Sequence, residues 1–228
     1  MRVCLIRHGS TAGNLEKRYV GTTDEPLTDG AVHALKELQV CPGADQEARA
    51  VIVSPLRRCI ETARLLFPQE KLRIAEDLRE CAFGKFEYKN YQELSGDPDY
   101  QAWIDSGGEL PFPGGESRAA FADRCCRAFV QACVDAQQDG YKEAVFVVHG
   151  GTIMAVMERF ALPHRPYFEW QVKNAEGFSG GLFWKTDAHG KQRPEIKEIS
   201  TWNHTTLFIK KETAAPAAVW TDKERRNG

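Results

Sequence analysis

VCLIRHGSTAGN, residues 3–14, contains a short apolar run that stops at an arginine, a histidine and a glycine. The run does not alternate with polar residues, which is typical of a strand buried on both faces of a parallel sheet. Arg7 and His8 follow it directly. Open α/β sheets bind ligands beyond the carboxyl ends of their strands, so this segment predicts functional side chains at that edge of the sheet.

Three further apolar runs indicate the other strands of the same sheet. They are AVIV (50–53), LRIA (72–75) and AVFVV (144–148). Helical patterns separate the runs and are found at LTDGAVHALKEL (27–38), SPLRRCIETARLLF (54–67), the amphipathic stretch after PGGES (113–117) and TIMAVMERFAL (152–162). Strands that alternate with helices in this way predict a three-layer α/β/α fold with a mostly parallel central sheet.

Local signals predict where some of these elements begin. Thr28 is expected to cap the helix that follows it, and Ser54 to cap the next helix with Pro55 at its first position. After residue 165 the pattern changes to β. The expected meander or edge strands are EWQV (169–172), GGLFWK (180–185) and EIKEISTWN (195–203).

The chain organisation predicts one domain over residues 1–209. Within it, residues 84–115 form an irregular insert rich in glycine, proline and aromatic residues, which we interpret as a lid or substrate-side subdomain. Residues 210–228 have little periodicity and are expected to form a flexible tail.

Composition excludes several functional classes. The 228 residues include 30 basic and 32 acidic ones, so no global charge favours nucleic acid or an anionic membrane as a partner. No apolar run approaches the roughly 20 residues that cross a bilayer, and the apolar run before Arg7 is too short for a signal peptide. The seven cysteines contain no CxxC pair, which favours a reduced, cytoplasmic protein. Four histidines, His33, His164, His189 and His204, have no partner at metal-ligand spacing in the sequence, so no metal site is expected.

Polar side chains gather after the strong apolar runs and suggest phosphate chemistry. His149 follows 144–148, Arg58 follows 50–53, and the weaker run 72–75 leads to Glu80. Arginine pairs well with phosphate oxygens, and a neutral histidine can attack phosphorus. The charges of Arg7 and Arg58 would help to keep His8 neutral, and a carboxylic acid such as Glu80 would protonate the leaving oxygen.

Six blocks in this order resemble the histidine phosphatase, or phosphoglycerate mutase-like, superfamily along nearly the whole chain. The blocks are LIRHGSTAGN, YVGTTDEPLTDGA, SPLRRCIETA, LRECAFGKFE, PGGES and VVHGG. The resemblance implies a phosphoglycerate mutase-like fold in which His8 becomes phosphorylated and Glu80 acts as general acid and later as base.

The same resemblance implies the phosphate-binding residues. Arg7, Arg58 and His149 would bind the phosphoryl oxygens, Asn14 would contact the phosphate, and Gly21 would supply a backbone contact near the pocket rim. The S-x-L-x-R spacing selects Arg58 rather than Arg57, which is expected to be a solvated helix residue. In one departure, Phe86, Glu87 and Tyr88 stand where the family often has tryptophan, glutamate and glycine, which affects the expected pocket shape.

The expected function is a metal-independent phosphomonoesterase that acts on a small phosphorylated metabolite without a cofactor. The LPFPGGES block (110–117) is similar to small-molecule phosphatases, including those acting on α-ribazole 5'-phosphate. A phosphoglycerate-mutase-type phosphotransferase is the alternative, but the insert carries only Lys85 and Lys89 as basic residues, so water is favoured as acceptor. A non-catalytic phospho-ligand-binding protein is less favoured because the chain keeps both His8 and Glu80. The sequence indicates no oligomeric state.

Overall fold

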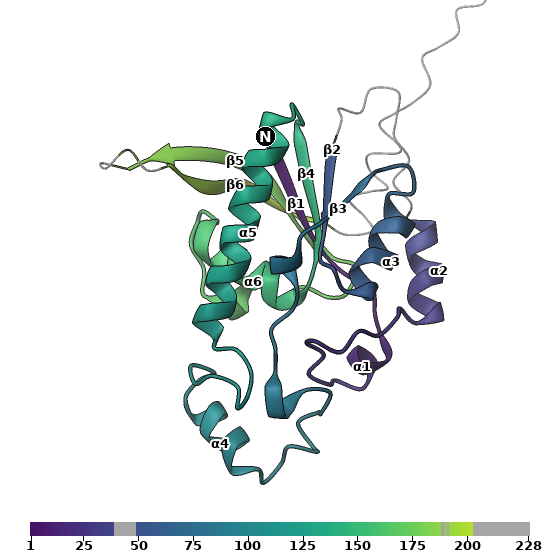
Figure 1. Ribbon diagram of the computed structural model, residues 1–228, viewed down its shortest axis with the longest axis vertical. Helices are drawn as coiled ribbons and strands as arrows, with labels where there is room; N and C mark the ends of the chain where they lie inside the picture. The colour runs from purple at the N-terminus through teal and green to yellow at the C-terminus, as the bar shows by residue number, and fades with distance from the viewer. Residues whose placement is uncertain (39–48, 188–189, 191, 203–228) are drawn as a thin grey trace, which may run out of the picture.

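A single mixed sheet forms the centre of the protein in the computed structural model, which describes residues 1–38, 49–187, 190 and 192–202. The strand order is β3-β2-β4-β1-β5-β6 (Figure 1). The strands are β1 (Arg2–Arg7), β2 (Arg49–Val53), β3 (Leu72–Ile74), β4 (Glu143–Val148), β5 (Gly177–Thr186) and β6 (Gln192–Trp202). The first four in the strand order are parallel, and β5 and β6 add as antiparallel strands. The four apolar runs therefore form the parallel strands predicted from the sequence.

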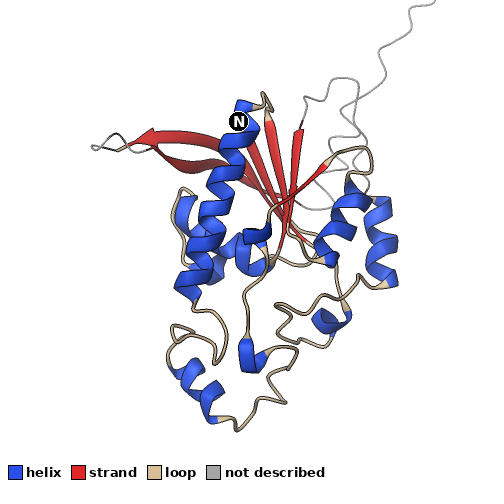
Figure 2. Ribbon diagram, in the orientation of Figure 1, coloured by secondary structure: helices blue, strands red, loops and turns tan. Residues whose placement is uncertain are grey.

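Helices cover both faces of this sheet (Figure 2). Their bounds are α1 (Ala12–Leu15), α2 (Asp29–Glu37), α3 (Arg57–Leu66), α4 (Pro98–Asp105), α5 (Arg118–Gln138) and α6 (Gly150–Phe160), with short 3-10 turns η1 (Glu76–Leu78), η2 (Gly84–Phe86) and η3 (Tyr167–Trp170). One core cluster joins α5 and α6 to the sheet, and a second joins α2 and α3 to its other face. The predicted three-layer α/β/α architecture is confirmed.

Helix capping agrees with the sequence at one site and differs at another. Thr28 caps α2, because its side chain accepts from the backbone N–H of Ala31. The expectation that Ser54 caps the next helix, with Pro55 at its first position, is wrong. Helix α3 begins only at Arg57, and Leu56 occupies the cap position without a side-chain hydrogen bond. The Ser54 hydroxyl instead contacts His149, so a tertiary contact has replaced the local cap.

The C-terminal β prediction is confirmed for 180–185 and for 195–202, which lie within β5 and β6. It is wrong for 169–172, where η3 and a loop replace the strand. The reason is tertiary, because Trp170 is 1% exposed in the core and its indole N–H donates to the Arg165 carbonyl. The predicted tail at 210–228 lies outside the described residues.

The segment predicted as an insert lies at the end of the sheet where β1 and β4 finish (Figure 1). It contains η2 and α4, and Asp97 caps α4. Its aromatic rings pack against one another and against Phe83 and Tyr19 outside it. These rings are Phe86, Tyr100, Trp103 and Phe112. The insert therefore has a small aromatic core of its own beside the carboxyl edge of the sheet.

Two sequence expectations can be compared with the described residues. No helix formed by the described residues is long and apolar enough to cross a membrane. The six cysteines in this part of the chain are buried, and none of them is in a disulfide. These six free thiols agree with the expectation of reduced cysteines.

Phe129 in α5 provides a test of the packing. Its ring is fully buried against Phe146 and Phe160. Phe129→Ala should lower the free energy of unfolding by about 3–5 kcal/mol, because it leaves a cavity between α5 and the sheet. Phe183→Ala, at a ring that is 45% exposed, should change it by about 0.5 kcal/mol or less. Urea unfolding measures both, and similar losses would contradict this view of the core.

Candidate active site

The pairing of β1 with β4 brings two histidines together. Arg7 lies opposite Val148 in the parallel register, so His8 and His149 leave the sheet side by side. Their ring centroids are 5.2 Å apart with an interplanar angle of 66°. Both side chains are buried, at 4% and 0% exposure. Two distant sequence motifs therefore form one site at the carboxyl edge.

The protonation of His8 is set by its surroundings. Its Nδ1 lies 2.7 Å from the carbonyl oxygen of Gly9, which can only accept, so Nδ1 carries the proton and Nε2 keeps its lone pair. Burial lowers the pKa of His8 well below its ordinary value, and the charges of Arg58 and Arg7 lower it further. This confirms the expectation that the arginines help to keep His8 neutral.

The two arginines are held by backbone carbonyls. Arg58 is fully buried and donates to Thr23 (2.8 Å), Gly21 (2.9 Å) and Val20 (3.3 Å) through its terminal nitrogens. Arg7 donates from Nη1 to the Val172 carbonyl at 2.8 Å. In both arginines the Nε–H is buried and has no partner among the described residues. Arg58 therefore does not present a free planar fork to a ligand, because both of its terminal nitrogens already donate to backbone carbonyls.

Glu80 lies within this charged group. Its carboxylate accepts from the backbone N–H groups of Cys81 (2.9 Å) and Gly151 (3.3 Å). Burial raises the pKa of Glu80, and these hydrogen bonds and the charges of Arg58 and Arg7 oppose that rise. At a given pH, the Glu80 carboxyl group is therefore protonated in a larger fraction of molecules than an exposed glutamate is.

His149 has a partner that the sequence did not indicate. Its Nε2 lies 2.7 Å from Ser54 Oγ, and Cys59 Sγ lies 3.5 Å from the same nitrogen. Burial lowers the pKa of His149 well below its ordinary value, with smaller effects from Arg58, His8 and Arg7. Ser54 therefore orients a ring that is neutral at neutral pH.

Asn14 is oriented by an asparagine that sequence reasoning missed. Its Oδ1 accepts from the Thr11 N–H (3.3 Å) and from Asn174 Nδ2 (3.0 Å). The amide nitrogen of Asn14 has no acceptor among the described residues, so it remains available to a ligand. Asn174 Nδ2 also contacts the His8 carbonyl at 3.0 Å. Asn174 lies in an irregular loop, where no periodicity or motif distinguishes it.

Gly21 is close to the site, but its N–H is occupied. It donates to Glu87 Oε1 at 2.9 Å, and the same oxygen accepts from the backbone and side chain of Thr23. A Cβ at Gly21 would overlap the Cys81 carbonyl oxygen, so only glycine fits. The Gly21 N–H is thus paired with Glu87 at the rim, and a backbone contact between Gly21 and a ligand stays a prediction.

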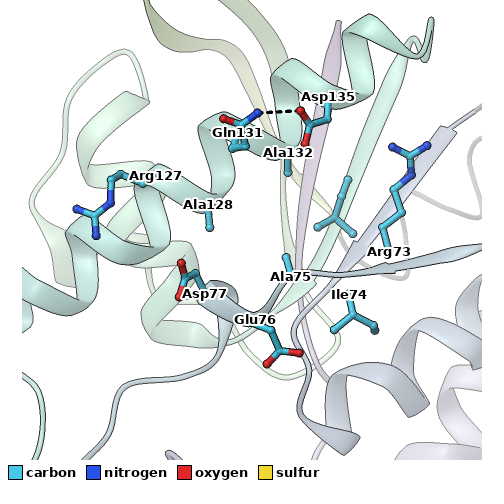
Figure 3. A pocket seen from close by; sticks show the side chains of 11 residues that line it. Arg73, Ile74, Ala75, Glu76, Asp77, Arg127, Ala128, Gln131, Ala132 and Asp135 are labelled. Carbon is cyan, nitrogen blue, oxygen red and sulfur yellow. Dashed lines mark hydrogen bonds between the residues drawn. The ribbon is translucent and has the colours of Figure 1, made fainter.

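A separate hollow of about 510 Å³ lies between the β3–η1 segment and α5 (Figure 3). None of the predicted site residues lines it. Side chains of both charges line the hollow. Arg73 and Arg127 are basic, and the acidic residues are Glu76, Asp77 and Asp135. This mixture of charges does not favour a phosphate.

The geometry agrees with comparisons to known proteins. The profile of the histidine phosphatase superfamily (branch 1) matches residues 3–177. The chain belongs to this superfamily. It is 29% identical over 178 residues to the adenosylcobalamin/alpha-ribazole phosphatase of Escherichia coli (strain K12), which covers 75% of this chain and 85% of that protein. It is also 31% identical over 163 residues to phosphoglycerate mutase-like protein 4 of Arabidopsis thaliana, which covers 69% and 70%.

The solved structures show the same fold. The alpha-ribazole phosphatase from Shigella flexneri aligns with a TM-score of 0.70 at 24% identity, covering 86% of this chain and 95% of that one. The resemblance read from the motif blocks is thus confirmed, and so is the phosphoglycerate mutase-like fold. Membership of the superfamily makes the chain a phosphatase-type enzyme, and the structure brings Arg7, His8, Arg58, Glu80 and His149 to one edge of its sheet.

The two adjacent arginines give a matched test. Arg58→Ala removes a buried Nε–H and releases three carbonyls, so the rate should fall by roughly 10² to 10³. Arg57 is exposed and pairs with Glu61 at 2.6 Å, so Arg57→Ala should change the rate by about twofold or less. Turnover and the dissociation constant of inorganic phosphate measure both effects. Equal losses would show that the site has been assigned to the wrong arginine.

Proposed function

We propose that the protein hydrolyses a small phosphorylated metabolite through a phosphohistidine on His8, without a metal. The observation that carries this proposal is the pair of buried, unpartnered Nε–H groups of Arg7 and Arg58 beside a neutral histidine. Buried donors are normally satisfied, so these two call for an acceptor. A phosphate group bound beside His8 would bring oxygens to this group of donors.

In the first step, His8 Nε2 attacks phosphorus and the bond from phosphorus to the ester oxygen breaks. The leaving oxygen takes its proton from Glu80, whose pKa burial raises. The Arg7 and Arg58 Nε–H groups and the Asn14 amide stabilise the charge that gathers on the phosphoryl oxygens. His149, whose ring centroid lies 5.2 Å from that of His8, would also contact the phosphoryl group.

In the second step, water attacks the phosphohistidine. The Glu80 carboxylate takes a proton from this water, the N–P bond breaks, and inorganic phosphate leaves with both residues restored. His8 needs no tautomer change during the cycle, because the Gly9 carbonyl keeps the proton on Nδ1 throughout. The chain thus carries a nucleophile, an acid–base group and anion donors without a metal.

Water is favoured over a second substrate as the acceptor. A mutase retains its phosphorylated product, which calls for free basic groups around the pocket. In the insert, Lys85 is paired with Asp97 (3.0 Å) and Asp99 (2.6 Å), and Arg118 just after it is paired with Glu109. A phosphotransferase of the mutase type remains the second candidate, since relatives of this chain also carry the name of phosphoglycerate mutase.

The remaining parts of the proposal concern context. We assign one histidine phosphatase domain to residues 1–209 and place the protein in the cytoplasm, in keeping with its reduced, buried cysteines. The substrate is a small phosphomonoester, since the aromatic insert lies beside the site (Figure 1).

Removing the nucleophile tests the covalent step. His8→Ala should lower turnover of a small phosphomonoester by roughly 10⁴ to 10⁶, because only binding and oxyanion stabilisation remain. Rapid quench with labelled substrate and a chelator present should trap an acid-labile, base-stable adduct in the unmodified enzyme and in the control variant, but not in His8→Ala. His33→Ala, at an exposed helix position, is the control.

The same experiment separates the alternatives. An acid-stable adduct, or activity lost with the chelator and restored by a divalent ion, would refute the mechanism. Transfer of the label to a second metabolite in preference to water would support the mutase alternative. Binding of phosphate without any turnover would indicate a non-catalytic protein.

The pH dependence tests Glu80 as the acid. The pKa of His8 is lowered, so its protonation reduces the rate only on the acid side. The pKa of Glu80 is raised, so its ionisation reduces the rate as the pH rises, and a bell results. In a single turnover, Glu80→Gln should slow phosphoenzyme formation from an alkyl phosphate by roughly 10² to 10⁴ and abolish the alkaline limb.

An activated leaving group provides the contrast. With p-nitrophenyl phosphate, whose leaving group departs without a proton, the same substitution should have little effect on that step. Glu76→Gln, at an exposed neighbour, is the control. Equal slowing of the two substrates would remove Glu80 from the role of general acid.

A further inference from the structure

Glu80 is carried by irregular backbone. It lies between η1 and η2, with neither helix nor strand at positions 80–83. Proton transfer requires heavy atoms within about 2.6–3.2 Å, so a loop that carries the acid has to be held in place.

Arg124 in α5 holds the N-terminal side of the loop. Its Nη1 donates to the carbonyls of Asp77 (2.7 Å) and Arg79 (3.1 Å), and its Nη2 reaches the Glu80 carbonyl at 3.5 Å. The side chain is buried at 7% exposure. One guanidinium thus contacts the backbone of the acid itself and of two residues just before it.

Glu116, in the PGGES block, holds the C-terminal side. Its Oε2 accepts from the Ala82 N–H at 3.1 Å, and its own N–H donates to the Ala82 carbonyl at 2.9 Å. The same carboxylate receives Arg124 in a bidentate pair, Nε to Oε1 at 3.0 Å and Nη2 to Oε2 at 2.7 Å. The ion pair therefore brackets Glu80 from both sides.

A general stabilising role does not account for this pair well. Desolvation offsets much of the attraction in a buried ion pair, so a hydrophobic pair often gives similar stability. A hydrophobic pair cannot make the four hydrogen bonds that this pair makes to the loop backbone, which are those to the carbonyls of Asp77, Arg79 and Glu80 and to the N–H of Ala82. Arginine's rigid planar fork suits this task, and lysine's single ammonium does not.

We propose that the Arg124–Glu116 pair is a positioning device for the general acid, and that it sets how well Glu80 reaches the leaving oxygen. The inference rests on the proposed function, in which Glu80 protonates that oxygen. Arg124 and Glu116 touch no substrate and act only through the loop. The pair also links the end of the insert to the acid, since Glu116 follows the insert directly.

The test uses phosphoenzyme formation in a single turnover of the full chain, with an alkyl phosphate and with p-nitrophenyl phosphate. Arg124→Lys keeps the charge but loses the fork, and should slow the alkyl phosphate by about 10- to 100-fold, as expected for a misplaced catalytic group. It should slow p-nitrophenyl phosphate by about threefold or less, because this leaving group needs no acid. Loss of both rates in equal measure would overturn the proposal.

A second variant protects the test against misfolding. Glu116→Ala removes the other half of the pair from a partly exposed position and should show the same selectivity between the two substrates. Arg159→Met breaks the Arg159–Asp123 ion pair (2.7 Å) between α6 and α5, and Glu109→Gln breaks the pair with Arg118. Both controls should leave the two rates within about twofold of the unmodified enzyme.

A double-variant comparison gives the decisive result. In a Glu80→Gln background no acid remains to be positioned, so Arg124→Lys should cause no further loss with the alkyl phosphate. If the losses multiply instead, the pair acts on something other than Glu80 and the proposal fails while the proposed function stands. If Glu80→Gln alone shows no preference between the substrates, the acid assignment fails, and the positioning role fails with it.

Discussion

The parallel register between β1 and β4 is the constraint on which the site depends. Because Arg7 lies opposite Val148, the next residue of each strand is a histidine, and the two rings emerge at the same height. Neighbouring β2 ends beside β4 and adds Ser54 to the same edge, with Arg58 in the first turn of α3. These strands are buried on both faces, so core packing fixes the geometry of the charged groups.

Burial of charge is the second constraint, and it explains the chemistry. Two arginines, two histidines and a carboxyl group share a site with little water. Backbone carbonyls accept from the terminal nitrogens of both arginines, and desolvation makes both histidines neutral and favours the protonated form of Glu80. The remaining charges of the site are the positive charges of Arg7 and Arg58. Their unpaired Nε–H groups favour an anion as the ligand. A bound phosphate would therefore stabilise the folded protein as well as react in it.

The insert joins specificity to catalysis. Its aromatic rings form a small core beside the site, and Gly84 and Gly115 allow its base to pack backbone to backbone near Ala82 and Pro113. Glu87 in the insert region holds the rim at Gly21 and Thr23, while Glu116 at its end meets Arg124. A change in the insert would therefore alter both the pocket wall and the placement of Glu80. This coupling helps to explain how one fold can serve different phosphate esters.

The local chain determined the parallel strands, the helix that begins after Thr28 and the clustering of Arg7, His8, Arg58, Glu80 and His149 at one edge, because apolar periodicity and motif spacing are local properties. Tertiary structure alone decided what those side chains touch. Ser54 reads as a helix cap, yet its hydroxyl turns to His149 from 95 positions away. The segment 169–172 reads as a strand, yet burial of Trp170 makes it a turn. Asn174 carries no local signal. Glu116 stands in the PGGES block, but its contact with Ala82 and the contact of Arg124 with Asp77 join segments that are distant in sequence and meet only when α5 and the insert have packed.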